Sequence, residues 1–223
     1  MSSAASQSVS NLLPAERTTR RRRKDARPSE LTAAALELFV EQGFAATRFD
    51  HVAARAGVSK GTLYLYFNSK EALFKAVVED GMVAALVAAE QHLSDHHGSA
   101  TELLQQLLRG WWEQIGSTSM AGVSKLIIAE SRNFPELAEY YRERVIRRGR
   151  ALLRSALQRG IDAGEFRPVD VEATVDVIIA PLLMLAISRF SLRLCGQEVA
   201  PEAYLDAHLA LLLHGLSRGE GAR

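Results

Sequence analysis

The stretch of sequence that decides the fold is Thr47–Lys70, which reads TRFDHVAARAGVSKGTLYLYFNSK. It contains two short helical patterns, which are separated by Ala56-Gly57-Val58-Ser59. Gly57 permits the backbone conformation that a tight turn requires, and Val58 can fill the angle between the two helices. Two short helices joined in this way form a helix-turn-helix, and the second helix of that motif enters the major groove of DNA.

The start of the second helix carries residues suited to a DNA surface. Ser59 is a good N-cap, and the unpaired N–H groups at a helix N-terminus favour a phosphate. Gly61 lets the backbone approach closely. Lys60 can reach guanine acceptors or a phosphate, and Thr62 can bond a phosphate or offer its methyl group to thymine. We therefore expect Ser59, Lys60, Gly61 and Thr62 to lie against DNA.

Long side chains later in the stretch extend this expected surface. Tyr64 and Tyr66 supply stiff hydroxyl donors for the DNA backbone, and the alternative for both is packing within a small domain. Lys70 opens the following helix and can hold a further phosphate. Leu63 and Phe67 are assigned to the core.

Capping motifs are expected on both sides of the second helix. Thr47, with Asp50 three residues later, resembles a capping box for the first helix. Asn68, with Glu71 three residues later, offers a cap for the helix after the motif. These pairs predict where the flanking helices begin.

The residues that match a known family extend on both sides of the turn. They are Phe39, Gly43-Phe44, Thr47, Val52-Ala53, Ala56-Gly57-Val58-Ser59-Lys60-Gly61-Thr62-Leu63-Tyr64, Tyr66-Phe67, Ser69-Lys70-Glu71 and Leu73-Phe74. Over about residues 25–85 this pattern resembles the TetR/AcrR family of bacterial transcriptional regulators. The resemblance implies a three-helix DNA-binding domain, a C-terminal domain for ligand binding and dimerisation, and repression relieved by a small molecule.

The resemblance also assigns roles to individual positions. It implies phosphate contacts by Thr47, Thr62, Tyr64 and Lys70. It implies positions near the bases for Ser59 to Thr62 and for Tyr66. Arg48 departs from the pattern, because a small hydroxyl residue is common there. Arg48 either adds a phosphate contact or is simply exposed, and we include it among the expected DNA-binding residues.

Helical periodicity continues outside the motif. Leu31, Ala35, Leu38 and Phe39 form one apolar face, and Gly43 ends that helix. Further helical patterns follow to residue 216, and no alternating strand pattern of useful length occurs. The sequence predicts an all-α chain of about nine helices. We expect a three-helix helix-turn-helix domain over residues 25–85 and a helical bundle for effector binding and dimerisation over residues 86–223.

The charge is distributed unevenly along the chain. Residues 1–75 contain 12 Lys and Arg against 7 Asp and Glu, whereas the remainder has a net charge of −4. Residues 1–24 include the run Arg20–Lys24 and lack an apolar face, so we expect a disordered basic arm. Such an arm either contacts DNA phosphates or is a solvated tail. A basic N-terminal third indicates that this part faces a polyanion.

The C-terminal half carries signs of an interface between subunits. The segment Val177–Ile187 is apolar nearly all round and requires burial on several sides. The apolar run Val177–Ser188 is too short to span a bilayer, so no membrane partner is expected. The family resemblance implies that the last two helices form the interface of a homodimer, with a four-helix bundle between the subunits.

Large apolar side chains in the same half are candidates for an effector pocket. Trp112, Phe134, Tyr141 and Met184 could line a site for a small apolar or amphipathic molecule. Ordinary core packing is the alternative for each of them.

Enzymatic chemistry is not indicated. No nucleophile motif, phosphate-cradling glycine loop or acid/base pair is found, so we expect no enzyme activity and no cofactor. His92 and His96 have a spacing that could bind a metal, but a solvated loop end explains them, and no metal site is expected. The single cysteine, Cys195, fits a reducing, cytoplasmic environment.

The leading hypothesis is a dimeric repressor that a small ligand releases from its DNA operator. An activator or an architectural DNA-binding protein would use the same motif. A helical enzyme that carries a helix-turn-helix, such as a recombinase, would need a catalytic constellation in residues 100–223.

Overall fold

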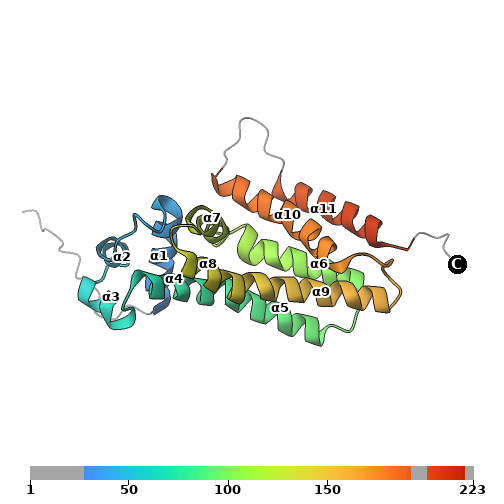
Figure 1. Cartoon of the computed structure of the whole chain (residues 1–223), viewed down its shortest axis with the longest axis horizontal. Helices are drawn as coiled ribbons and strands as arrows, with labels where there is room; N and C mark the ends of the chain where they lie inside the picture. The colour runs from blue at the N-terminus through green and yellow to red at the C-terminus, as the bar shows by residue number, and fades with distance from the viewer. Residues whose placement is uncertain (1–27, 192–199, 219–223) are drawn as a thin grey trace, which may run out of the picture.

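The computed structural model describes residues 28–191 and 200–218, which form an elongated helical molecule (Figure 1). The N-terminal helices are α1 (Pro28–Gln42), α2 (Phe49–Arg55), α3 (Lys60–Tyr66) and α4 (Lys70–Val78). The later helices are α5 (Ala84–Asp95), α6 (Ala100–Trp111), α7 (Ala121–Glu130), α8 (Pro135–Tyr141), α9 (Arg147–Asp162), α10 (Val171–Ser191) and α11 (Pro201–Leu216). Three π-helical turns join or extend them: η1 (Glu79–Val83), η2 (Trp112–Gly116) and η3 (Arg142–Ile146). The predicted basic arm and Cys195 lie outside the described residues.

The π turns make several helices continuous. The helices α4 and α5 form one rod through η1, α6 runs on into η2, and α8 and α9 form another rod through η3. Counted as rods, the described residues contain nine helices, as the apolar periodicity predicts. Within the same residues, an isolated bridge between Phe166 and Ser217 is the only strand-like pairing. The all-α prediction is confirmed.

The helices α1 to α4 gather at one end of the molecule (Figure 1). Phenylalanine rings fill their core: the centroids of Phe39 and Phe44 lie 5.4 Å apart, and those of Phe44 and Phe74 lie 5.7 Å apart. Phe134, just before α8, places its ring centroid 4.7 Å from that of Phe44. The core of the N-terminal cluster is therefore completed by a side chain from the C-terminal half.

Two glycines end helices at this end of the molecule. Gly43 has φ +87° and ends α1, and Gly57 has φ +72° in the turn between α2 and α3. A residue with a Cβ atom is strained in this left-handed region, so both positions favour glycine. The predicted turn positions are confirmed.

The predicted capping box of α2 is wrong. The N-cap is Arg48, and its side chain makes no capping hydrogen bond. Thr47 is turned into the core instead, where its hydroxyl donates to the carbonyl oxygen of Gly43 at 2.7 Å. Thr47 does not cap α2 because it lies one residue before the N-cap and its hydroxyl is directed toward the end of α1.

The predicted N-cap is correct for α3 and wrong for α4. The Ser59 Oγ accepts from the backbone N–H of Thr62 at 3.0 Å, as expected for the N-cap of α3. At α4 the N-cap is Ser69 rather than Asn68, and its Oγ accepts from the backbone N–H of Ala72 at 3.1 Å. A serine one residue later therefore does the capping.

The larger bundle is built on α5, α6 and α9, which lie side by side along the long axis (Figure 1). Leu104 and Leu157 are fully buried between the helices. A Cβ atom on Gly160 would lie 2.1 Å from the ring of Phe166, so α9 and the turn after it meet as closely as a glycine allows. This close contact fixes the chain as it turns from α9 toward α10.

The helix α10 is longer than its apolar run alone predicted. Val171–Arg189 has a mean hydropathy of 1.9 and is long and apolar enough to cross a membrane, by length and composition. The apolar run Val177–Ser188 is too short for a span, but the helix that contains it is not. In the structure α10 packs on α7 and α9, and it buries Val175 and Ile178. Its Met184 side chain is 56% exposed, so the described residues leave one side of this apolar helix uncovered.

Candidate nucleic-acid interface

One edge of α3 attaches it to the N-terminal cluster. Leu63 is its one buried residue, and Val58 in the preceding turn is also buried. The helix packs on α2 and turns most of its other side chains toward solvent. This arrangement is the one that the sequence predicts for a helix that enters a DNA groove.

A surface hollow of about 300 Å³ lies beside the starts of α2, α3 and α4. It is lined by Thr47, Arg48, Phe49, Asp50, Lys60, Tyr64, Asn68, Ser69 and Lys70, and we call it the α2–α4 hollow. Five of the nine predicted DNA-binding residues line it: Thr47, Arg48, Lys60, Tyr64 and Lys70. Three cationic side chains and one carboxylate share this hollow, so its charge suits an anion.

Tyr64 and Lys60 are held together above this hollow. The ring centroids of Tyr64 and Phe49 lie 4.8 Å apart, and the Lys60 Nζ lies 5.9 Å from the Tyr64 ring centroid. Contact with Phe49 restricts the Tyr64 ring, and the ammonium group gains a cation–π attraction. Tyr64 still exposes half of its surface, which leaves it available for a partner.

Lys70 has a structural role in addition to the predicted one. Its Nζ donates to the carbonyl oxygens of Phe44 at 2.7 Å and Ala45 at 3.0 Å. The same ammonium lies 4.6 Å from the Phe44 ring centroid. Partial burial lowers the pKa of Lys70, although neighbouring carboxylates oppose the shift. Because an ammonium group has three donors, two of these bonds leave one for a phosphate.

Thr47 and Arg48 differ sharply in accessibility. Thr47 is only 2% exposed, and its hydroxyl is bonded internally, so we assign its side chain no direct phosphate contact. Arg48 is exposed, and its Nε donates to Asp50 Oδ1 at 3.1 Å. This hydrogen bond lowers the pKa of Asp50. A phosphate at Arg48 would therefore compete with the Asp50 carboxylate.

The other four predicted residues, Ser59, Gly61, Thr62 and Tyr66, lie outside the lining of the hollow. The Ser59 and Thr62 hydroxyl oxygens lie 2.8 Å apart and hydrogen-bond to each other. Gly61 and Tyr66 are exposed on α3. Contacts of these four residues with DNA stay predictions, as do those of the five that line the hollow.

The sequence prediction passed over Leu65. This leucine is 83% exposed, the most exposed of the large apolar side chains on α3. The sequence could have indicated this exposure. Leu65 lies two residues after Leu63, which was assigned to the core, and therefore on the opposite side of the helix.

The turn η1 connects this region to the larger bundle. In it, Asp80 Oδ2 accepts a hydrogen bond of 2.8 Å from the Thr32 hydroxyl on α1. Its neighbour Glu79 accepts from Arg144 Nε at 2.8 Å and from the Tyr140 hydroxyl. The hydrogen bond from Arg144 contributes most to lowering the pKa of Glu79. Adjacent residues of one turn thus join α1 to the α8–α9 rod.

The four predicted pocket residues are not all brought together: Phe134 and Tyr141 share one apolar cluster, and Trp112 belongs to another. Phe134 belongs to the N-terminal core, and Tyr141 is buried with its hydroxyl 2.9 Å from the Ser124 hydroxyl. Met184 is exposed on α10, whereas Trp112 is buried at the start of η2. Of two hollows in the described residues, one is lined by Trp112, and neither is lined by Phe134, Tyr141 or Met184.

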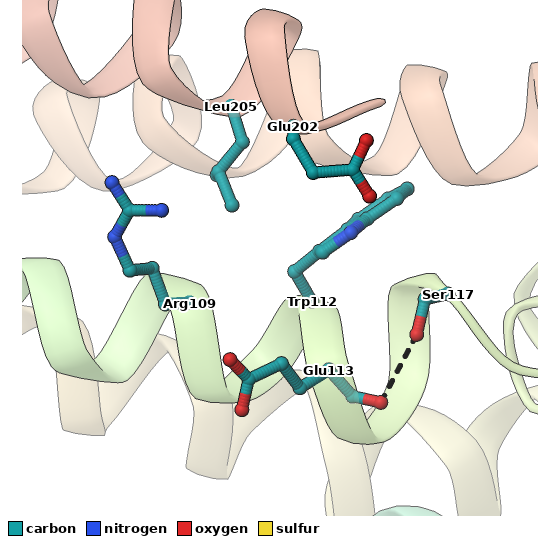
Figure 2. Close-up of a pocket in the computed structure, with 6 residues that line it drawn as sticks. All are labelled: Arg109, Trp112, Glu113, Ser117, Glu202 and Leu205. Carbon is teal, nitrogen blue, oxygen red and sulfur yellow. Dashed lines mark hydrogen bonds between the residues drawn. The ribbon is translucent and has the colours of Figure 1, made fainter. Parts of the chain in front are cut away.

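Trp112 does line a small cavity of about 240 Å³ between the α6–η2 rod and α11. Figure 2 shows Arg109, Trp112 and Glu113 on one side and Glu202 and Leu205 on the other. The walls are therefore mixed, with charged groups beside one indole ring and one leucine. This composition differs from the apolar lining that the sequence led us to expect.

An exposed recognition helix, a basic hollow beside it and a connecting rod into a larger helical bundle together define a DNA-binding transcriptional regulator rather than an enzyme. The chain belongs to the TetR family. Residues 31–77 match the family of bacterial regulatory proteins of the tetR type, and residues 94–193 match the tetracyclin repressor-like C-terminal domain.

Relatives and structures agree with this assignment. The uncharacterized HTH-type transcriptional regulator YfiR of Bacillus subtilis is 31% identical over 160 residues, which cover 68% of this chain and 74% of YfiR. The HTH-type transcriptional repressor KstR2 of Mycolicibacterium smegmatis is 26% identical, with 87% of this chain and 93% of KstR2 covered. The crystal structure of FadR from Bacillus subtilis in complex with stearoyl-CoA has a TM-score of 0.72 at 23% identity, with 85% of this chain and all of that chain covered.

Proposed function

We propose that the chain is a cytoplasmic, dimeric repressor that a small apolar or amphipathic molecule releases from a double-stranded DNA operator. Residues 25–85 form the DNA-binding domain, and residues 86–223 form the effector-binding and dimerisation domain. The observation that carries the proposal is the α2–α4 hollow, because it gathers Arg48, Lys60, Tyr64 and Lys70 beside the exposed face of α3. A DNA phosphate is an anion of the size and charge that this hollow suits.

Exposed apolar side chains on the last two helices support the dimer. Val177 and Met184 on α10, and Leu211 on α11, are all more than half exposed. The two helices pack on each other and lie along one side of the molecule (Figure 1). Two such pairs related by a twofold axis would bury these side chains in a four-helix bundle. A symmetric dimer presents two copies of α3 to a palindromic operator.

The connection through η1 supports release by an effector. A ligand that moves the α8–α9 rod would move Glu79 through Arg144 and Tyr140. Asp80 would pass that movement to Thr32 on α1. Release requires that the ligand bind the DNA-free arrangement more tightly than the DNA-bound one. In the same fold, FadR of Bacillus subtilis was crystallised in complex with stearoyl-CoA, an amphipathic molecule.

The DNA-binding assignment is tested by a double variant, Lys60→Ala with Tyr64→Phe. Each substitution removes one polar contact to phosphate, so affinity for a selected operator should fall at least about tenfold. The slope of log affinity against log salt concentration should also become shallower by about 1 for each lost lysine contact, and therefore by about 2 for the dimer. Lys70 is kept intact because it also supports the fold.

The matched control is Lys125→Ala, which removes an exposed lysine from α7. Fluorescence anisotropy with a labelled operator measures both variants across a salt series. The control should bind like the unmodified chain. A double variant that keeps full affinity and the full salt slope contradicts the proposed interface.

A further inference from the structure

An apolar crest runs along the solvent side of α3. Successive residues of an α-helix are turned by about 100°, so Leu65 points about 200° away from the buried Leu63. Gly61 precedes Leu65 by four residues and lies on the same line of the helix surface. A Cβ atom on Gly61 would meet only the Ser59 hydroxyl, at 3.7 Å, so the crest is open there. The outermost line of α3 thus carries a leucine and a glycine.

The surroundings of the crest are polar and basic. Tyr64 and Tyr66 flank Leu65 in the sequence and are themselves exposed. Lys60 lies at the start of the same helix and lines the basic α2–α4 hollow. Leu65, with 83% of its surface exposed, therefore lies on the solvent side of α3 next to Tyr64, which lines this hollow. Little in the described part of the chain covers it.

The major groove offers one apolar group to such a side chain. The C5-methyl group of thymine projects into that groove, and aliphatic contact with it distinguishes an A·T pair from the others. We propose that Leu65 contacts the C5-methyl group of one thymine in each operator half-site and so helps to set sequence preference. The inference rests on the proposed DNA-binding function and deepens it.

Replacement of thymine by deoxyuridine tests this contact, because uracil keeps the hydrogen-bonding groups of thymine and lacks its methyl group. The probe is a duplex selected from a random pool by the unmodified chain, with each thymine replaced in turn. One position per half-site should weaken binding by about fourfold, as expected for exposing one methyl-sized apolar group. Replacement at both symmetric positions should multiply the two losses.

The variant Leu65→Ala should remove that sensitivity at that position alone. It should bind the thymine duplex more weakly and bind the thymine and deoxyuridine duplexes equally well. Because Leu65 is exposed, the melting temperature of the Leu65→Ala variant should equal that of the unmodified chain. The control Ile128→Ala, which shortens an exposed isoleucine on α7, should keep the original deoxyuridine profile.

Two outcomes overturn the inference while leaving the proposed function intact. In one, the unmodified chain binds tightly and no thymine position is sensitive to loss of its methyl group. In the other, Leu65→Ala keeps the same sensitive position as the unmodified chain. Failure of the unmodified chain to bind any duplex instead contradicts the proposed function, and the inference with it.

Discussion

At the scale of single residues, Lys70 joins the DNA-facing surface to the core. Its ammonium donates to two carbonyl oxygens, those of Phe44 and Ala45, in the turn after α1. The substitution Lys70→Met keeps the aliphatic stem and removes the donors. It should lower the free energy of unfolding by about 1 to 3 kcal/mol, because two carbonyl groups lose a charged partner.

Urea unfolding followed by circular dichroism measures this effect, with Lys125→Met as the control. The control should unfold at the same urea concentration as the unmodified chain, since Lys125 is exposed. A Lys70→Met variant as stable as the control would mean that the two hydrogen bonds contribute nothing to the fold.

Tyr141 makes stability depend on alkaline pH. Burial raises the pKa of Tyr141 to about 12 from the usual 10.0, although the bond with Ser124 opposes the shift. The unfolded chain therefore loses this proton first, so stability falls as pH rises above 10 and levels off near 12. The variant Tyr141→Phe should lack this part of the loss.

Unfolding in urea at about pH 9 and about pH 11 compares the two proteins on either side of the ordinary tyrosine pKa. The unmodified chain should lose more stability between these values than Tyr141→Phe. Equal losses would show that ionisation of Tyr141 is not coupled to folding.

The sequence predicted the turn before α3 and the N-cap of α3 correctly, but it placed the caps of α2 and α4 wrongly. Ser59 caps α3 and Gly57 adopts a positive φ, because both features depend on neighbours within four residues. Thr47 and Lys70 were only partly predicted. Whether a hydroxyl or an ammonium turns toward solvent or toward the end of α1 depends on how α1, α2 and α4 pack, and residue type alone does not reveal it.

At the scale of helices, the contact between α1 and α7 sets how the N-terminal cluster sits on the bundle. A Cβ atom on Gly122 of α7 would lie 2.5 Å from Cγ2 and 2.8 Å from Cγ1 of Val40 on α1. The β-branched valine has little rotamer freedom in a helix, so it cannot turn aside easily. The variant Gly122→Ala should therefore force the two helices apart and destabilise the protein by about 1 to 3 kcal/mol.

The control is Gly110→Ala on α6, where an added Cβ atom meets nothing within 4 Å. Alanine at that position should stabilise the protein by up to about 1 kcal/mol, since it favours the helix over the unfolded chain. Melting temperatures from calorimetry give the comparison. A Gly122→Ala variant as stable as Gly110→Ala would show that α1 and α7 tolerate separation.

The nine rods followed from apolar periodicity, but the three π turns did not. A π turn contains one extra residue, which rotates the apolar face of the helix by less than one turn. In the sequence this small rotation looks the same as an uncertain helix boundary. The turns η1 and η3 contact each other, so their positions reflect tertiary packing. That packing also brings Glu79 to Arg144, a contact between residues too distant in sequence to be predicted.

At the scale of the whole molecule, the proposed function requires a dimer formed through α10 and α11. The double variant Met184→Glu with Leu211→Glu places charges on two exposed apolar positions of these helices. Burying those charges at an interface is costly, so the variant should sediment as a monomer and bind a palindromic operator poorly. The control Ile128→Glu, on α7, should remain dimeric.

Sedimentation velocity shows whether the unmodified chain, the double variant and the control are monomers or dimers. A monomeric unmodified chain, or a double variant that stays dimeric, contradicts the proposed interface. The family resemblance implied an interface at the last two helices, and the apolar character of α10 agreed with it. Which of its residues face outward became known only from its packing on α7 and α9.

The most direct test of the account is to recover bound duplexes from a pool of random DNA with the full chain. We expect enrichment of one inverted repeat whose half-sites lie about one helical turn, roughly 34 Å, or slightly more apart. The variant Lys60→Ala with Tyr64→Phe should enrich the same repeat much more weakly, because it loses phosphate contacts and keeps the base contacts. Recovery of no preferred sequence by the unmodified chain, or equally strong enrichment by the variant, would contradict the claim that α3 and the α2–α4 hollow bind DNA.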